Sequence, residues 1–198
     1  MIKFKLPKPL IVLDLETSGT DTEISSIIQI GAYIISEDGI LTNNSFEVYI
    51  KPYTDHWKPE AEKVHKIKKS FLMQEGFELE NALDKLEKWI GEPRKYTFTQ
   101  WGNGFDTEML RKAYIYLKKP YPFCTKSFDI ASIIKFDFLL RGLKGDKNLE
   151  NCANSYGIKV KSHLVHNARY DAFLTGLLFE KFIRSKINSE KNSMVIQA

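Results

Sequence analysis

Residues Pro9–Glu16 read PLIVLDLE: an unbroken apolar run, Leu10–Leu13, is followed at once by two carboxylates, Asp14 and Glu16. Such a run is typical of a central strand that is buried on both faces. Because side chains alternate along a strand, Asp14 and Glu16 leave the same face of the sheet. Two neighbouring carboxylates on an apolar face repel each other and lose hydration, and a divalent cation removes that conflict. The ordinary alternative, a strand that ends in solvent, is the stronger explanation of an isolated Asp-x-Glu.

The patterns that follow predict a mixed α/β domain. Residues 27–35 and 46–50 predict two more strands, and the short connections make the three strands an antiparallel meander. Further along, the apolar spacing becomes helical, and we expect helices at 78–90, 107–117, from 130, at 149–156 and at 168–187, with short strands at 95–100 and 124–129. A meander followed by alternating helices and strands predicts one domain over residues 1–187. The polar residues 188–198 predict a flexible C-terminal tail.

The bulk composition excludes several classes of protein. The chain has 198 residues, 43% apolar and 27% charged, as a single globular domain has. Its 29 basic and 25 acidic residues give a net charge of +4, which is compatible with a polyanionic partner but does not establish one. Two cysteines make no disulfide framework, and no apolar run reaches the length of a signal peptide or of a membrane span. We therefore expect a cytoplasmic protein with no membrane partner, while the oligomeric state stays open.

Two later segments carry polar residues at the starts of helices. Asp106 follows Phe105 just after the strand predicted at 95–100, where an Asp also commonly caps a helix. Asp171 lies in the first turns of the helix predicted at 168–187, and His166 stands five residues before it in the preceding loop. A histidine there can take a proton from water near neutral pH. Taken singly, each residue is explained at least as well by capping or by surface exposure, so the combination carries the prediction.

The order of these motifs resembles the DEDDh exonucleases, which include the proofreading subunits of bacterial replicases, RNase T and oligoribonuclease. The shared pattern is Asp14-x-Glu16 on a strand, Phe105-Asp106 at a helix start, and His166-x-Ala-x-x-Asp171 on the last long helix. The resemblance extends over about residues 9–185. It implies an α/β, RNase H-like fold: a mixed five-stranded sheet, with the antiparallel meander followed by parallel strands, flanked by helices.

Two segments between the motifs fit the family with one departure each. Ile27–Ala32 (IIQIGA) looks like its second strand, with Gln29 where Glu is common. Val64–Ile67 (VHKI) resembles its Val-His-Gly-Ile loop, with Lys66 in place of glycine. Neither departure affects an implied metal ligand, so both bear on substrate details more than on activity.

The position four residues before the final Asp separates the two branches of the superfamily. The tyrosine branch needs Tyr there, whereas this chain has Asn167, and Tyr170 is adjacent to Asp171 and points elsewhere on the helix. His166 occupies the position of the histidine branch, and His163 stands three residues too early. The resemblance therefore makes His166 the base.

The resemblance implies a two-metal-ion 3′–5′ exonuclease that releases 5′-mononucleotides from single-stranded DNA or RNA, with DNA slightly favoured. Two Mg²⁺ or Mn²⁺ ions are its implied cofactors, and hard carboxylate oxygens suit them. The implied partner is the 3′ end of the nucleic acid, and a DNA polymerase is a further candidate partner. The implied metal ligands are Asp14, Glu16, Asp106 and Asp171, the implied base is His166, and the candidate substrate-binding residues are Thr17, His65 and Phe105. Phe105 is equally well explained as a core aromatic.

Three alternatives compete with this interpretation. A zinc site built from Cys124, Cys152, His163 and His166 lacks a close cysteine pair and fits no common zinc module. Another RNase H-like nuclease with a different acid set is disfavoured by the His-x-Ala-x-x-Asp segment. A catalytically silent module that binds nucleic acid or a polymerase on the same fold is the main alternative. Loss of a ligand would indicate it, and all five positions are intact.

Overall fold

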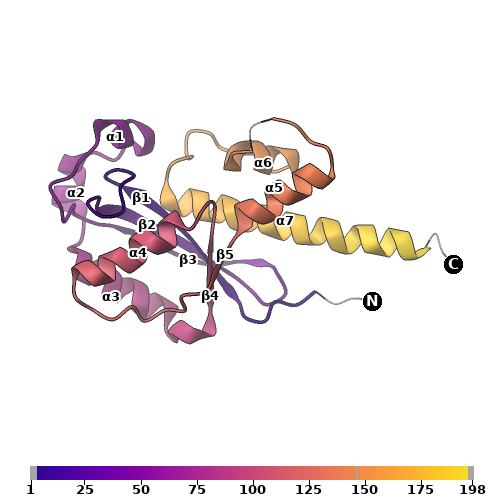
Figure 1. Ribbon diagram of the computed structural model, residues 1–198, viewed down its shortest axis with the longest axis horizontal. Coiled ribbons are helices and arrows are strands. Elements are labelled where there is room, and N and C mark those ends of the chain that lie inside the picture. The colour runs from indigo at the N-terminus through magenta and orange to yellow at the C-terminus, as the bar shows by residue number, and fades with distance from the viewer. Residues whose placement is uncertain (1–3, 146, 196–198) are drawn as a thin grey trace.

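The computed structural model describes residues 4–145 and 147–195 and is built on a five-stranded mixed sheet (Figure 1). The strands are β1 (Leu10–Thr17), β2 (Ile27–Ile35), β3 (Leu41–Tyr49), β4 (Thr97–Gln100) and β5 (Ser127–Asp129), in the order β3-β2-β1-β4-β5. β1 pairs antiparallel with β2, and β2 with β3, whereas β1 and β4, like β4 and β5, run parallel. The predicted meander followed by parallel strands is therefore confirmed.

The helices are α1 (Pro59–His65), α2 (Lys69–Glu75), α3 (Leu79–Ile90), α4 (Phe105–Tyr116), α5 (Ile130–Leu140), α6 (Leu149–Ser155) and α7 (Ala168–Val195), with a 3₁₀ turn at Pro93–Lys95. The sequence prediction missed α1 and α2, because each has only seven residues and shows no apolar period. It also began β3 too late, at 46, and placed the start of α4 at 107, so that Asp106 lies inside the helix rather than before it.

The C-terminal helix is longer than predicted. α7 continues past 187 as far as Val195, and it extends away from the sheet toward the C-terminal end of the chain (Figure 1). Residues 196–198 lie outside the described part of the chain, and the flexible tail at 188–198 stays a prediction. Within the described ranges, no helix combines the length and the apolar character that crossing a membrane requires.

The alternation of side chains along β1 divides the core into two layers. Ile11, Leu13 and Leu15 pack with residues of α3 and α4 on one face. Leu10 and Val12 pack with residues of α5, α6 and α7 on the other face. Since Asp14 and Glu16 continue the row of Leu10 and Val12, both carboxylates point to the side of the sheet that α7 covers.

A glycine lets α7 touch the sheet next to these carboxylates. Gly31 on β2 is paired with Asp14 on β1. A Cβ at Gly31 would lie 2.1 Å from the carbonyl carbon of Ala168 and 2.1 Å from the amide nitrogen of Arg169. Glycine inside a strand is typical of such a close backbone approach. The first turn of α7 therefore packs directly on β2, next to Asp14.

The buried side chain of Gln29 stabilises the same contact between β2 and the start of α7. Its Oε1 accepts a hydrogen bond from the backbone amide of Ala168 at 3.1 Å, and its Nε2 donates one to Glu47 Oε1 on β3 at 2.8 Å. A glutamate at this position could not donate to Glu47, so the departure from the family pattern has a physical role. Gln29 links β3, β2 and the start of α7 through one amide group.

Candidate active site and metal centre

Glu16, His166 and Asp171 form a compact group at the end of β1. One ligand atom from each residue lies within 4.8 Å of the others. Asp171 Oδ2 accepts a hydrogen bond from the backbone amide of His166 at 2.9 Å, whereas the buried Oδ1 has no hydrogen-bond partner among the described residues. A buried carboxylate oxygen without a partner is energetically costly. A cation at this group would satisfy it.

Asp14 and Asp106 complete the acidic cluster without joining that tight group. Asp14 is half-buried on β1 and lines the cavity beside the cluster. Asp106 lies in the first turn of α4 and is only 6% exposed. Burial raises the pKa of this carboxylate, and hydrogen bonding to the backbone of Leu15 on β1 opposes that shift. Asp106 therefore reaches from α4 to the backbone of β1, which is more than the simple helix cap that the sequence alone suggested.

The four carboxylates disturb each other's ionisation. Burial raises the pKa of Asp14 well above its usual value, and repulsion by Asp106, Asp171 and Glu16 raises it further. Burial, with repulsion from Asp171 and Asp106, raises the pKa of Glu16 to about 8. Burial also raises the pKa of Asp106 to about 7 and that of Asp171 to about 6, against hydrogen bonds that lower both.

This electrostatic conflict fits a divalent metal. Four crowded carboxylates lose hydration and repel each other, and a doubly charged cation reverses both effects. The donors are hard oxygens with one imidazole beside them, which suits Mg²⁺ or Mn²⁺ better than metals that prefer sulfur. The unpartnered Oδ1 of Asp171 is the observation that most directly supports a bound cation.

His166 stands at the entry to α7 in an uncommon backbone conformation. Its φ is +66°, in the left-handed region, and its side chain is exposed. The hydrogen bond from its amide to Asp171 fixes that turn and keeps the imidazole within reach of Glu16. His163 is exposed and does not line the cavity around the cluster. Neither cysteine belongs to the group formed by Glu16, His166 and Asp171, so this group gives no support to the zinc alternative.

A cavity of about 310 Å³, here called the acidic cavity, opens beside the cluster. Trp101, from the loop between β4 and α4, and Glu150 on α6 line it together with Asp14, His166 and Asp171. Repulsion from Glu150 adds to the raised pKa of Asp171, and Ser162 Oγ donates a hydrogen bond to Glu150 Oε1 at 2.6 Å. The sequence interpretation missed Glu150 because nothing in its local pattern marks it. It did not connect Trp101 with the cavity either.

Two of the three predicted substrate-binding residues are the last residues of β1 and of α1. Thr17 is half-buried at the end of β1, and its hydroxyl donates to the carbonyl of Gly19 at 2.7 Å. His65 is buried at the end of α1; its Nδ1 accepts from the amide of Ile67 at 2.9 Å, and its Nε2 has no partner among the described residues. Burial lowers the pKa of His65, Glu62 opposes this, and His166 lowers the pKa further. The neutral ring therefore carries its proton on Nε2, as an unused donor near His166.

Phe105, the third predicted residue, is the first residue of α4. It is partly buried and packs against the core layer formed with α3 and α4. This packing matches the core-aromatic alternative, and a contact with substrate stays a prediction.

Gln29 and Gly31 were not predicted as site residues, although both position α7. A glycine in the middle of the strand at 27–35 was a usable signal, since such a glycine often marks a close backbone approach. The role of Gln29 depends on Glu47 and Ala168, which are distant in sequence, so no local pattern contained it.

The fold is RNase H-like, and the acidic cluster lies at the end of its central strand, β1. The family model described as exonuclease, RNase_T, matches residues 11–179, and the chain belongs to this exonuclease family. The resemblance seen in the sequence is confirmed at this level. No curated protein sequence matches the chain.

Solved structures of nucleases share the fold. E. coli exonuclease I in complex with a dT13 oligonucleotide has a TM-score of 0.79 and 16% identity, covering 95% of this chain and 43% of that one. The zinc-bound form of the E. coli exonuclease I complex with single-stranded DNA has a TM-score of 0.77 and 18% identity, with coverages of 88% and 40%. Cell-death related nuclease 4 has a TM-score of 0.74 and 14% identity, with coverages of 90% and 64%. The chain thus spans less than two thirds of each of these proteins.

Proposed function

We propose that the chain is a two-metal-ion 3′–5′ exonuclease that releases 5′-mononucleotides from single-stranded nucleic acid. The observation that carries the proposal is the group of Glu16, His166 and Asp171 within 4.8 Å, which includes a buried carboxylate oxygen without a partner. Membership of the exonuclease family supports the reaction class. All five motif side chains are present, and this weighs against a silent binding module on the same fold.

Asp14, Glu16, Asp106 and Asp171 would hold two divalent cations, Mg²⁺ or Mn²⁺. When bound, such ions make the attacking water more acidic and offset the negative charge that develops on the phosphodiester. His166 is exposed at the rim of the acidic cavity, where its imidazole can accept the proton of that water. The hydrogen bond from the amide of His166 to Asp171 stabilises the turn that carries this imidazole.

Thr17, His65 and Phe105 are the proposed contacts to the terminal nucleotide. His65 is the best supported by geometry, because its Nδ1 accepts from Ile67 and its buried Nε2–H has no partner among the described residues. A shift of the side chains that cover Nε2 would let it donate to a phosphate or sugar oxygen. Its lowered pKa keeps the ring neutral at physiological pH, so His65 would donate a hydrogen bond without adding a charge. DNA is slightly favoured as the substrate, since oligodeoxynucleotides occupy the related exonuclease I structures.

Digestion of end-labelled oligonucleotides tests the proposal. Single-stranded DNA and RNA of one sequence, labelled at the 5′ end, are incubated with Mg²⁺, with Mn²⁺ or with chelator. We expect a ladder that shortens from the 3′ end and depends on the metal. Degradation that persists in chelator contradicts the two-metal mechanism, and binding without any degradation supports the silent module.

Paired variants separate catalysis from folding. Asp14→Asn is expected to abolish turnover and to leave the melting temperature of the metal-free protein equal or higher, because it relieves crowding among carboxylates. Asp129→Asn is the matched control, since Asp129 accepts hydrogen bonds from Ala131, Ser132 and Gly102 and caps α5. Because Asn caps a helix about as well as Asp, this control is expected to change stability little and to retain activity. Near-normal activity of Asp14→Asn would rule out its role as a ligand.

A further inference from the structure

A second pocket lies on the other side of the segment that carries His166. Its volume is about 410 Å³, within the range of sites that hold small ligands or single nucleotides. The segment 164–171 forms the wall between it and the acidic cavity. Leu164, Asn167 and Tyr170 face the second pocket, whereas Val165, His166 and Asp171 face the acidic cavity. Leu174 on α7 lines both.

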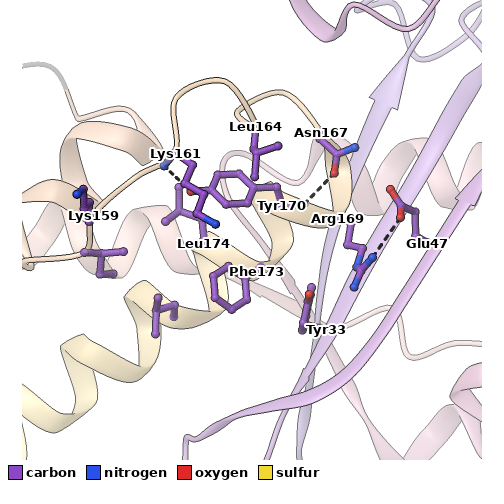
Figure 2. Close-up of a pocket in the computed structure, with 12 residues that line it drawn as sticks. Tyr33, Glu47, Lys159, Lys161, Leu164, Asn167, Arg169, Tyr170, Phe173 and Leu174 are labelled. Carbon is purple, nitrogen blue, oxygen red and sulfur yellow. Dashed lines mark hydrogen bonds and ion pairs between the residues drawn. The ribbon is translucent and has the colours of Figure 1, made fainter.

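Three aromatic rings follow one another along this pocket. The ring centroids of Tyr33 and Phe173 are 5.5 Å apart, and those of Phe173 and Tyr170 are 6.3 Å apart. The hydroxyl of Tyr170 accepts a hydrogen bond from the backbone amide of Lys161 at 2.7 Å, which holds the 158–164 loop against the helix (Figure 2). The pocket therefore has an ordered aromatic lining rather than a collection of mobile side chains.

Cations lie at both ends of the aromatic row. Lys159 and Lys161 are exposed at the loop end, and neither forms an ion pair with any residue of the described ranges. Arg169 lies at the opposite end, 3.5 Å from Glu47 (Figure 2). Glu47, the only carboxylate lining the pocket, also accepts the hydrogen bond of Gln29. The pocket thus presents three cationic side chains against one acidic side chain that is already engaged.

We infer that the second pocket binds a nucleotide of the substrate strand upstream of the 3′ end. Aromatic faces stack on bases of any sequence, and lysines beside them attract the phosphates, which is how proteins hold single strands without reading sequence. The shared wall lets one strand place its 3′ end in the acidic cavity and an upstream base against Tyr33, Phe173 and Tyr170. This inference rests on the proposed function, and it adds a contact that would hold the strand between successive cleavages.

Binding without cleavage tests the pocket directly. A fluorescein-labelled oligothymidylate of 12 nucleotides and one of 3 nucleotides are titrated in chelator, with anisotropy as the readout. For Lys159→Glu/Lys161→Glu we expect at least tenfold weaker binding of the 12-mer and less than twofold change for the 3-mer. The slope of log K against log salt should fall by about 1.4, since each phosphate contact on a single strand contributes about 0.7.

The double variant Lys88→Glu/Lys126→Glu is the matched control, because both lysines are exposed, away from the pocket, and the net charge changes equally. It should change either affinity less than twofold. An equal loss in both double variants, or no loss in the pocket variant, overturns the inference; the latter result would leave the pocket to a ligand of another class, such as a protein partner.

Photocrosslinking locates the base. A 12-mer carrying a single 5-iododeoxyuridine at successive positions should give an adduct with Tyr33, Tyr170 or Phe173 at one upstream position, and adducts only elsewhere contradict the assignment. These readouts do not require turnover. If the parent protein degrades DNA and the pocket variant binds the 12-mer unchanged, only the inference about the second pocket is refuted. If the parent protein degrades nothing but the pocket variant shows the expected loss of binding, only the exonuclease mechanism is refuted.

Discussion

Gly31 lies directly opposite Asp14 across the antiparallel pair of β1 and β2, and the backbone at the start of α7 rests on that glycine. Because paired residues of antiparallel strands point to the same face, any side chain at Gly31 would enter the space that Ala168 and Arg169 occupy. The distance between Asp14 and the residues at the start of α7 thus depends on the absence of a side chain at Gly31.

Gly31→Ala should separate α7 from the sheet. Its Cβ would meet backbone atoms at 2.1 Å, which cannot move without displacing the helix. We expect a loss of about 1–3 kcal/mol in the free energy of unfolding and at least a tenfold loss of activity, measured by urea denaturation and by digestion of an oligonucleotide. Gly176→Ala on α7 is the control, because its Cβ meets the flexible tip of Leu41 at 2.6 Å. A fully active Gly31→Ala protein would disprove this positioning role.

The acidic cluster should make the metal-free protein less stable as pH rises. The unfolded chain ionises Glu16 and Asp106 near their usual values of 4.5 and 3.8, whereas the folded chain keeps their protons up to pKa values of about 8 and 7. The folded state therefore loses stability as pH rises toward and through these raised values.

Measurement between pH 6.5 and 8.5 isolates this effect, since the lowered pKa of His65 acts only below its usual value of 6.5. In chelator, the melting temperature should fall by a few degrees over this window, as about 1 kcal/mol corresponds to roughly 2–4 °C for a domain of this size. Mn²⁺ should reduce the fall, and Glu16→Gln should flatten it in chelator. A melting temperature that rises with pH would contradict the raised pKa values.

His166→Gln distinguishes a base from a metal ligand. The imidazole lies within 4.8 Å of Glu16 and Asp171, a separation that permits either role. If His166 is the base, turnover should fall by about 10²–10⁴-fold while Mn²⁺ still raises the melting temperature as in the parent protein. Loss of that metal-induced rise would instead make His166 a ligand. His163→Gln is the control and should change neither quantity.

Lys66 occupies a glycine conformation at the end of α1. Its φ is +60°, and its amide donates to the carbonyl of Glu62 at 2.8 Å, as the residue that closes a helix does. A non-glycine residue costs about 1–2 kcal/mol in this region, so Lys66→Gly should raise the free energy of unfolding by up to about 1 kcal/mol after the entropy of glycine is counted. Lys68→Gly, at φ −77°, should lower it instead. Urea denaturation of both variants measures these changes in the free energy of unfolding.

The sequence was most informative where side-chain periodicity and motif spacing agreed. The alternation at Asp14 and Glu16, the strand at 27–35 and the entry to α7 at Ala168 were predicted as the structure has them. The short helices α1 and α2 were not, because seven residues are too few to establish a period and α1 is held by tertiary contacts such as the hydrogen bond from Lys58 to Ser18.

The supports of the site were harder to predict than its acidic residues. Gln29 acts through partners on β3 and α7, and Glu150 enters the cavity from α6 only because α6 packs against α7. Such contacts join residues more than a hundred positions apart or depend on helix packing, and no local pattern encodes either. The ligand roles of the four carboxylates stay predictions that metal titration and the variants above address.

The acidic cluster draws its members from β1, from α4 and from the last helix of the fold, α7. During synthesis, β1 leaves the ribosome with Asp14 and Glu16 long before His166 and Asp171 emerge. A prematurely terminated product that ends before His166 therefore lacks both the proposed base and one carboxylate of the cluster. Under the proposed mechanism, an incomplete chain cannot cut nucleic acids, so activity begins only after α7 has been synthesised.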